Sequence, residues 1–230
     1  MPRCLRLATL MVFLPSAALA QSYVRFINAT PAELQAITVS IDGGDARELE
    51  YGRSTQRITV AEGSRTLKAV TTGPSPVTLV ERAITLTKDK YYSVVVTGQL
   101  FPGAYDIVVA EDDDTDPQGH LRVRYGLMAK GVLVSQAMQT PDLHIVCDGV
   151  KDIRVSSQAL KFSSYVDVQV PAGWTGGLCR VTLEVSQNSV WVPIWQDLSN
   201  YFFSPHSIYT VVSIGLDPAT LVLLRETDNK

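Results

Sequence analysis

The sequence is poor in the residues that build catalytic and metal sites, with three histidines and three cysteines among 230 residues. The histidines, His120, His144 and His206, are far apart and show none of the short spacings at which two metal ligands share one element. No serine lies in a complete nucleophile-elbow motif, and no glycine-rich loop has the spacing that cradles a phosphate. Paired carboxylates of the glycoside-hydrolase type have no characteristic spacing in a sequence, so a pair of this kind stays an open alternative. We therefore expect a protein that is not an enzyme and uses no cofactor.

Positive charge is also in short supply, since 20 lysines and arginines stand against 23 acidic residues, for a net charge of −3. Nucleic acids and anionic membrane surfaces are bound by basic faces, so neither is expected as a partner. Beyond residue 20 no apolar run is long enough to span a bilayer, which predicts no membrane span in the rest of the chain.

Residues 1–20 have the three parts of a secretory signal peptide. The segment begins with two arginines, continues with an apolar run over residues 7–14, and ends in Ala-Leu-Ala, a cleavage-site pattern. An uncleaved anchor is the alternative, but the apolar run is short and Pro15 interrupts it. Cleavage before Gln21 would leave 18 basic and 23 acidic residues, a net charge of −5. The expected location is the periplasm or the extracellular space.

Two cysteines follow the signal segment, Cys147 and Cys179, both in the second half of the chain. In an oxidising compartment such a pair is more often a disulfide than two free thiols. The bridge would close a loop of about 33 residues and would stabilise the fold by about 3.7 kcal/mol through chain entropy. Two buried thiols too far apart to join remain the alternative.

One stretch of the chain occurs twice, as an internal repeat. Residues 92–98 read Tyr-Ser-Val-Val-Val-Thr-Gly, and residues 209–215 read Tyr-Thr-Val-Val-Ser-Ile-Gly. Each is a β-branched run that a glycine closes, as in a buried strand that ends in a turn. Each is followed by a second apolar run, over residues 107–110 or 221–224. The chain is therefore predicted to be a tandem of two similar β domains.

Earlier strands recur in the same order. Residues 23–28 alternate large and charged side chains, and residues 121–125 repeat that alternation 98 positions later. The strand over residues 37–41 stops at Asp-Gly-Gly, and its counterpart over residues 143–147 stops at Asp-Gly. Helical periodicity is absent except for one turn at residues 31–36. Six or seven short strands in each half predict an all-β protein with two tandem antiparallel β-sandwich (Ig-like) domains.

The predicted domain boundaries follow from charge, proline and glycine. After the signal peptide, residues 21–111 form the first sandwich and residues 120–230 the second. Residues 112–119 are predicted to form an acidic linker between them, with the sequence Asp-Asp-Asp-Thr-Asp-Pro-Gln-Gly.

The motifs of the first half resemble an exported family, the domain of unknown function 4397. Residues 24–31 read Val-Arg-Phe-Ile-Asn-Ala-Thr-Pro, a later strand ends in Asp-Gly-Gly, and residues 91–98 read Tyr-Tyr-Ser-Val-Val-Val-Thr-Gly. Residues 22–115 resemble the family well and residues 120–229 more loosely, because the Asn-Ala-Thr-Pro signature is lost there. The resemblance implies a pair of extracytoplasmic β-sandwiches without assigned chemistry. In layout the chain is also distantly similar to the periplasmic alginate O-acetylation accessory factor.

The acidic linker is one candidate site. Asp112, Asp114 and Asp116 have the alternate spacing that begins a calcium-binding loop. However, Pro117 occupies the place where that loop needs glycine, and Val123 the place where it needs glutamate. A solvated spacer is therefore favoured over a weak calcium site.

A second candidate is a concentration of aromatic residues in the second half of the chain. Trp191 and Trp195 would share one face of a strand, although Pro193 between them indicates an edge or a bulge. Such residues bind protein partners or sugar rings, but they also complete cores and seal domain seams. The candidate partner-binding residues are Trp174, Trp191, Trp195, Tyr201, Phe202 and Phe203.

Two functions fit these observations. The first is a non-catalytic cell-envelope protein for binding, adhesion or scaffolding, with an envelope protein or a polysaccharide as its partner. The second is a periplasmic accessory subunit of a complex that modifies an exopolysaccharide.

Overall fold

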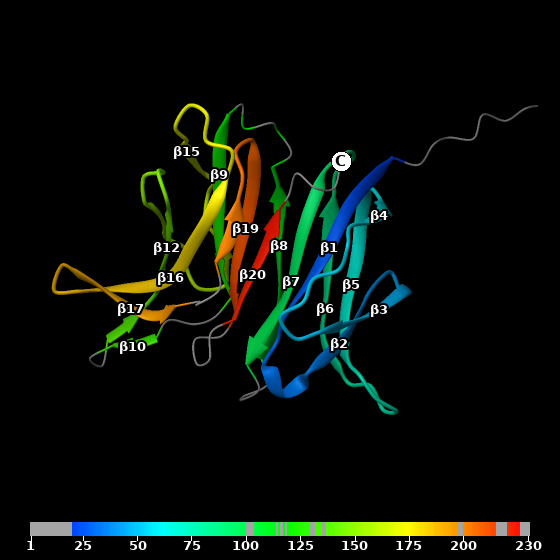
Figure 1. Ribbon diagram of the computed structural model, residues 1–230. Helices are drawn as coiled ribbons and strands as arrows, with labels where there is room; N and C mark the ends of the chain where they lie inside the picture. Colours follow the sequence, from blue (N-terminus) through cyan, green and yellow to red (C-terminus); the bar gives the residue numbers. More distant parts are fainter. Residues whose placement is uncertain are drawn as a thin grey trace, which may run out of the picture.

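The computed structural model describes residues 20–99, 104–113, 115, 117, 119–128, 132–134, 137–196, 200–214 and 220–225 (Figure 1). In this part of the chain every regular element is a strand, apart from the 3-10 turn η1 (Ala32–Leu34). The all-β fold and the single helical turn near residues 31–36 are thus confirmed.

The first eight strands form the two sheets of what we call unit 1. One sheet has the order β4-β1-β7-β8 and the other the order β3-β2-β5-β6. The strands are β1 (Gln21–Ala29), β2 (Ala36–Ile41), β3 (Gly44–Glu50), β4 (Ile58–Ala61), β5 (Gly63–Thr71), β6 (Thr78–Leu86), β7 (Tyr91–Gln99) and β8 (Ala104–Asp112).

The later strands form unit 2, with the same sheet orders. Its inner sheet, which faces unit 1, is β14-β9-β19-β20 with β15 also on β9; its outer sheet is β13-β12-β16-β17 with β18 also on β16. A separate hairpin joins β10 (Val132–Val134) and β11 (Ala137–Gln139). The other strands are β9 (His120–Leu127), β12 (Asp142–Cys147), β13 (Ile153–Val155), β14 (Lys161–Phe162), β15 (Val166–Gln169), β16 (Gly177–Gln187), β17 (Val190–Gln196), β18 (Tyr201–Phe203), β19 (Ser207–Ile214) and β20 (Thr220–Arg225).

Each unit departs from an antiparallel arrangement at one place. β1 pairs with β7 in parallel, and β9 pairs with β19 in parallel, while all other described ladders are antiparallel. Parallel neighbours need a long crossover connection, and here the chain supplies it by running through the other sheet of the same sandwich. The first and the next-to-last strands of each unit thereby become neighbours.

The parallel ladders fix how the two units correspond. Arg25 lies opposite Ser93 in unit 1, and Arg124 lies opposite Thr210 in unit 2. Arg25 therefore corresponds to Arg124 at an offset of 99 residues, and the offset of 98 expected from sequence was wrong by one. Because side chains alternate between faces, a shift of one residue exchanges the two faces of a strand.

A tyrosine hydroxyl confirms this correspondence on the neighbouring strands. The hydroxyl of Tyr92 accepts a hydrogen bond from the backbone N–H of Thr87 at 3.0 Å. The hydroxyl of Tyr209 accepts one from the N–H of Ser204, also at 3.0 Å. In both units the donor lies five residues before the tyrosine, as in the tyrosine corner of immunoglobulin-type sandwiches.

β1 is buried on both faces, although its alternating pattern predicted a half-buried strand. Val24 and Phe26 point into the core of unit 1, while Ile27 and Ala29 belong to a different cluster. That cluster, which we call the seam, joins the sheet of β1 and β7 to the inner sheet of unit 2. Its buried members are Ile27, Ala29, Val95, Met128, Val212, Ile214, Val222 and Leu224.

The four sheets therefore stack as four layers, with the outer sheets at the two ends (Figure 1). Three apolar clusters lie between them: the core of unit 1, the seam and the core of unit 2. The two central sheets are covered on both faces, which explains why β19 is buried at every residue.

The predicted disulfide is confirmed. Cys147 on β12 lies opposite Cys179 on β16, and their sulfur atoms are joined, with 4.3 Å between the two Cα atoms. In unit 1 the equivalent cross-strand pair is Ile41 with Leu67, which packs instead of bonding. The bridge is thus a feature of unit 2 and not of the fold.

Cys147→Ala combined with Cys179→Val should lower the free energy of unfolding by about 3 to 4 kcal/mol, because the unfolded chain regains the entropy of an open loop. Urea titration followed by circular dichroism measures the loss. Reduction of the unmodified protein should produce the same loss and should leave the variant unchanged. Since unit 1 uses Ile41 and Leu67 at this position, a variant without β structure in water would contradict the prediction.

Candidate functional site

Two of the three histidines have structural partners, whereas the buried Nδ1 atom of His120 has no hydrogen-bond partner among the described residues. The Nδ1 atom of His206 accepts the backbone N–H of Gly119 at 2.8 Å, and His144 lies between two carboxylates on the outer sheet of unit 2. Within the described ranges no group of three or more histidine, cysteine or acidic side chains is arranged to hold a metal ion. Nor does any described helix have the length and apolarity that crossing a bilayer requires.

The sequence suggested that Asp112 belongs to a solvated spacer, and this prediction was wrong. It ends β8, and its side chain is fully buried. Its Oδ2 atom lies 3.3 Å from Arg25 and 3.0 Å from Arg57, and it accepts the hydroxyl of Ser93 at 3.0 Å. Its Oδ1 atom accepts a hydrogen bond from Arg124.

This arrangement bears on the calcium hypothesis. Both carboxylate oxygens of Asp112 already accept hydrogen bonds from guanidinium or hydroxyl groups, so they do not form one side of an open calcium loop. Asp114 and Asp116, the other two residues of that hypothesis, lie outside the described residues.

The residue after Asp112 is also tied to unit 2. The backbone N–H of Asp113 donates to the hydroxyl of Tyr165 at 3.0 Å, and its carboxylate pairs with Arg122. Burial favours the protonated form of Asp113, but hydrogen bonds from Thr115 and the charge of Arg122 outweigh it and hold its pKa below the ordinary value. The chain between the units therefore begins as an anchored segment.

Arg25 and Arg124, the equivalent arginines of the two units, are used in the same way. The Nε atom of Arg25 donates to the hydroxyl of Ser93, and that of Arg124 donates to the hydroxyl of Thr210, both at 2.8 Å. Both guanidinium groups then reach the carboxylate of Asp112. The two equivalent arginines thus meet at one carboxylate, and we call Arg25, Arg57, Asp112 and Arg124 together the arginine clasp.

Arg124 has further contacts from unit 2. Its guanidinium carbon lies 4.8 Å from the ring centroid of Phe162 and 4.9 Å from that of Tyr165, within the range of cation–π attraction. It also donates to the backbone carbonyl of Glu111 at 2.9 Å. These contacts make the arginine clasp a structural junction between the units.

The Asn-Ala-Thr signature of unit 1 is structural as well. The side-chain amide of Asn28 donates to the carbonyl of Leu49 at 2.9 Å, and its oxygen accepts the N–H of Thr30 at 3.0 Å. Asn28 is fully buried, so this formal glycosylation sequon is closed in the folded protein. At the offset of 99, unit 2 has Leu127 in its core and Met128 in the seam, which explains why the signature is lost there.

The six candidate aromatic residues divide between core and surface. Phe203 is fully buried in the core of unit 2, and Trp174, Trp195 and Tyr201 pack against that core from partly buried positions. Trp191 and Phe202 are exposed. The sequence pattern could not separate these two roles.

Trp191 and Trp195 lie on opposite faces of β17, and the expectation that they share a face was wrong. Trp191 lies opposite Ser186, whereas Trp195 lies opposite Leu183, a residue of the unit 2 core. Between them the ladder has a β-bulge after Pro193, so one extra residue reverses the alternation. Proline cannot donate to the ladder, which is why the irregularity falls there.

The most exposed apolar side chains of unit 2 include a pair at the start of β16. Leu178 lies opposite Phe202 of β18, and 60% of Leu178 and 57% of Phe202 are exposed. Gly176 has a φ angle of +117°, and a Cβ atom there would lie only 2.7 Å from the ring of Phe202. Leu178 and Phe202 form what we call the edge patch.

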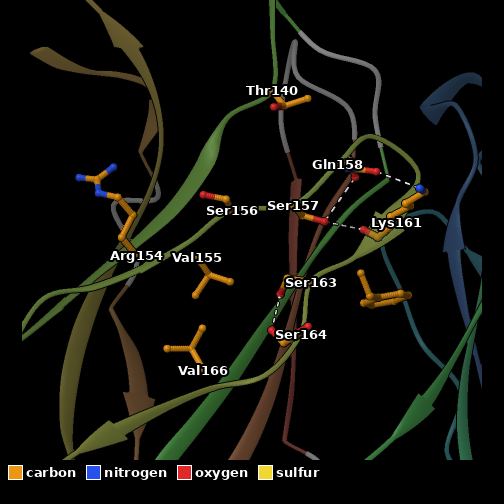
Figure 2. A pocket seen from close by; sticks show the side chains of 11 residues that line it. Thr140, Arg154, Val155, Ser156, Ser157, Gln158, Lys161, Ser163, Ser164 and Val166 are labelled. Carbon is orange, nitrogen blue, oxygen red and sulfur yellow. Dashed lines mark hydrogen bonds between the residues drawn. The ribbon is translucent and has the colours of Figure 1, made fainter. Parts of the chain in front are cut away.

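A hollow of about 670 Å³ also opens in unit 2, where β13 and β14 leave the sandwich edge uncovered (Figure 2). Its polar groups bond to one another: Ser157 donates to the carbonyl of Lys161 at 2.8 Å, and the Lys161 ammonium donates to Gln158 at 2.8 Å. Figure 2 shows the guanidinium of Arg154 turned away from the other lining side chains. The hollow therefore has no set of convergent groups that would carry a reaction.

Residues 22–130 match the model of a family described as a domain of unknown function, DUF4397. This segment is therefore similar to DUF4397 domains. The match confirms the resemblance noted in the sequence, and it runs from β1 to the end of β9, so it includes Arg25, Asp112 and Arg124 of the arginine clasp. The likeness in layout to an alginate O-acetylation factor finds no support.

Other comparisons add little. No curated protein matches the chain. Among solved structures, the chain is similar to the tip fimbrial protein Mfa3 from Porphyromonas gingivalis with C-terminal truncation, at 11% identity and a TM-score of 0.21. That similarity covers 90% of this chain and 98% of the other. The TM-score is too low for conclusions about fold or function.

Asp112→Asn should lower the free energy of unfolding by about 3 to 5 kcal/mol, because it leaves buried guanidinium groups without their counter-charge. Chemical denaturation measures the change. Asp106→Asn is the matched control, since Asp106 pairs with Arg82 at 3.3 Å but is largely exposed, and less than about 1 kcal/mol is expected there. Equal effects of the two variants would show that the arginine clasp does not stabilise the protein.

Trp195→Ala should lower the free energy of unfolding by about 3 kcal/mol, because it leaves a cavity against the unit 2 core. Trp191→Ala should cost less than about 1 kcal/mol, the value of an exposed cation–π contact with Arg154. Thermal unfolding of the two variants side by side makes the comparison. The reverse order would contradict the faces assigned to the two residues.

Proposed function

We propose that the protein is an exported, non-catalytic binding or scaffold protein of the cell envelope, and that a protein partner docks on the edge patch. The observation that carries the proposal is the exposure of Leu178 and Phe202 side by side. Aromatic and aliphatic side chains exposed together are typical of binding surfaces.

Unit 1 provides an internal comparison for this surface. Since Cys179 corresponds to Leu67, Leu178 corresponds to Thr66 on β5, where the side chain is polar and exposed. The same fold is thus built with a polar residue at this position. Stability alone does not require Leu178 to be apolar, which supports a binding role for it.

Three further observations support export and a non-catalytic role. Residues 1–19 of the signal-peptide pattern lie outside the described residues, but the Cys147–Cys179 disulfide fits an oxidising compartment. The DUF4397 family has no assigned chemistry, and the hollow of unit 2 has no convergent reactive groups. The seam holds the two units together, as a scaffold requires.

Leu178→Ser combined with Phe202→Ser should weaken binding to a fraction of envelope proteins from the producing cell by at least about 30-fold, as loss of an interface hot spot does. Quantitative co-sedimentation with the unmodified protein as reference measures binding. Val77→Ser is the control, because Val77 is equally exposed but lies in unit 1, and it should bind as the unmodified protein does. Undiminished binding by the double variant, with its fold confirmed by circular dichroism, would rule out the edge patch.

A further inference from the structure

A cluster of polar side chains and one tryptophan lies on the outward face of the outer sheet in unit 2. It consists of His144, Asp152, Arg154, Glu184 and Trp191, which we call the outer-face cluster. Four strands contribute to it or border it, and no residue of the edge patch belongs to it. Along β16 the two surfaces are separated by the eight residues from Leu178 to Ser186, about 27 Å at the rise of a strand.

The polar members of the outer-face cluster hold one another in place. The Oε1 atom of Glu184 lies 2.8 Å from Nδ1 of His144, and its Oε2 atom accepts from Arg154 at 2.6 Å. On the other side of the imidazole, Asp152 lies 3.3 Å from Nε2. Burial favours the protonated form of Glu184, but the hydrogen bonds from His144 and Arg154 outweigh it and lower its pKa. The cluster therefore contains fixed charges of both signs.

Trp191 has one side occupied and much of its surface exposed. The guanidinium carbon of Arg154 lies 3.8 Å from the ring centroid, a close cation–π contact, while 43% of Trp191 remains exposed. The Nη1 atom of Arg154 is buried and has no hydrogen-bond partner within the described part of the chain. The guanidinium of Arg154 therefore stiffens the indole of Trp191, and the rest of the aromatic surface stays accessible.

These charges narrow the kind of ligand. Two carboxylates, Asp152 and Glu184, oppose an anion, and the guanidinium already lying on Trp191 opposes a second cation on that ring. The ligand that these charges favour is an uncharged molecule. It has an apolar face that packs on the indole, and hydroxyl groups that both donate and accept hydrogen bonds. A saccharide ring has that chemistry.

We infer that the outer-face cluster is a binding site for an uncharged saccharide chain, with one sugar ring stacked on Trp191 and a hydroxyl group bonded to Asp152. The site goes beyond the proposed function, because it uses a different surface from the edge patch and a ligand of a different class. An outward sheet face suits an extended polymer, which needs no enclosed pocket.

Tryptophan fluorescence tests the inference directly, because only Trp191 of the three tryptophans is exposed. The probes are uncharged tetrasaccharides of glucose, mannose, galactose and N-acetylglucosamine, with a tetramer of mannuronate as the charged comparison. At least one uncharged probe should give a saturable change in emission. Trp191→Ala should abolish that change, while Trp195→Phe should retain it.

Binding of the same probe measured by calorimetry adds a second readout. Asp152→Asn should weaken it about tenfold, as the loss of one charge-assisted hydrogen bond does, without altering the fold, because Asp152 is exposed. Leu178→Ser with Phe202→Ser should leave saccharide binding unchanged, so failure of the edge patch and failure of this site are distinguishable. The inference is overturned if no uncharged probe binds, if only the mannuronate tetramer binds, or if binding survives Trp191→Ala.

Discussion

One buried carboxylate connects the two halves of this protein. Asp112 ends the last strand of unit 1, and it is approached by Arg25 and Arg57 of that unit and by Arg124 of unit 2. Removing four charged groups from water is costly, and the cost is offset only when their geometry and additional hydrogen bonds are good. Ser93 and Thr210 supply those bonds from equivalent places on β7 and β19. The position of one unit against the other follows from this requirement.

The seam imposes a second constraint on the two central sheets. Their strands need apolar or paired side chains on both faces, one for a sandwich core and one for the seam. Polar residues that face the seam are therefore bonded across it, as Thr97 is to the carbonyl of Met128 at 2.9 Å. The outer sheets are free of this constraint on their outward faces. Both proposed binding surfaces lie on such a face.

Comparison of the units separates what the fold needs from what unit 2 has added. Ile41 and Leu67 fill in unit 1 the place that the disulfide occupies in unit 2, and Thr66 occupies the place of Leu178. The tyrosine corners and the equivalent arginines are kept in both units. Shared features therefore belong to folding and to the junction. Differences on the outward face of unit 2 are the better guide to function.

Much of this could be predicted from residues that act locally. Alternation and β-branched runs predicted the strands, Asp-Gly pairs predicted the turns, and the doubled Tyr-to-Gly motif predicted the duplication. The disulfide pairing followed from having only two cysteines after residue 20. The features that only the tertiary structure decided depend on residues that are far apart in the sequence. Burial of Asp112 requires arginines up to 87 residues away in sequence, and the faces of Trp191 and Trp195 depend on a bulge in a ladder with β16. A sequence pattern specifies which residues alternate, but the faces they meet are set by packing between sheets.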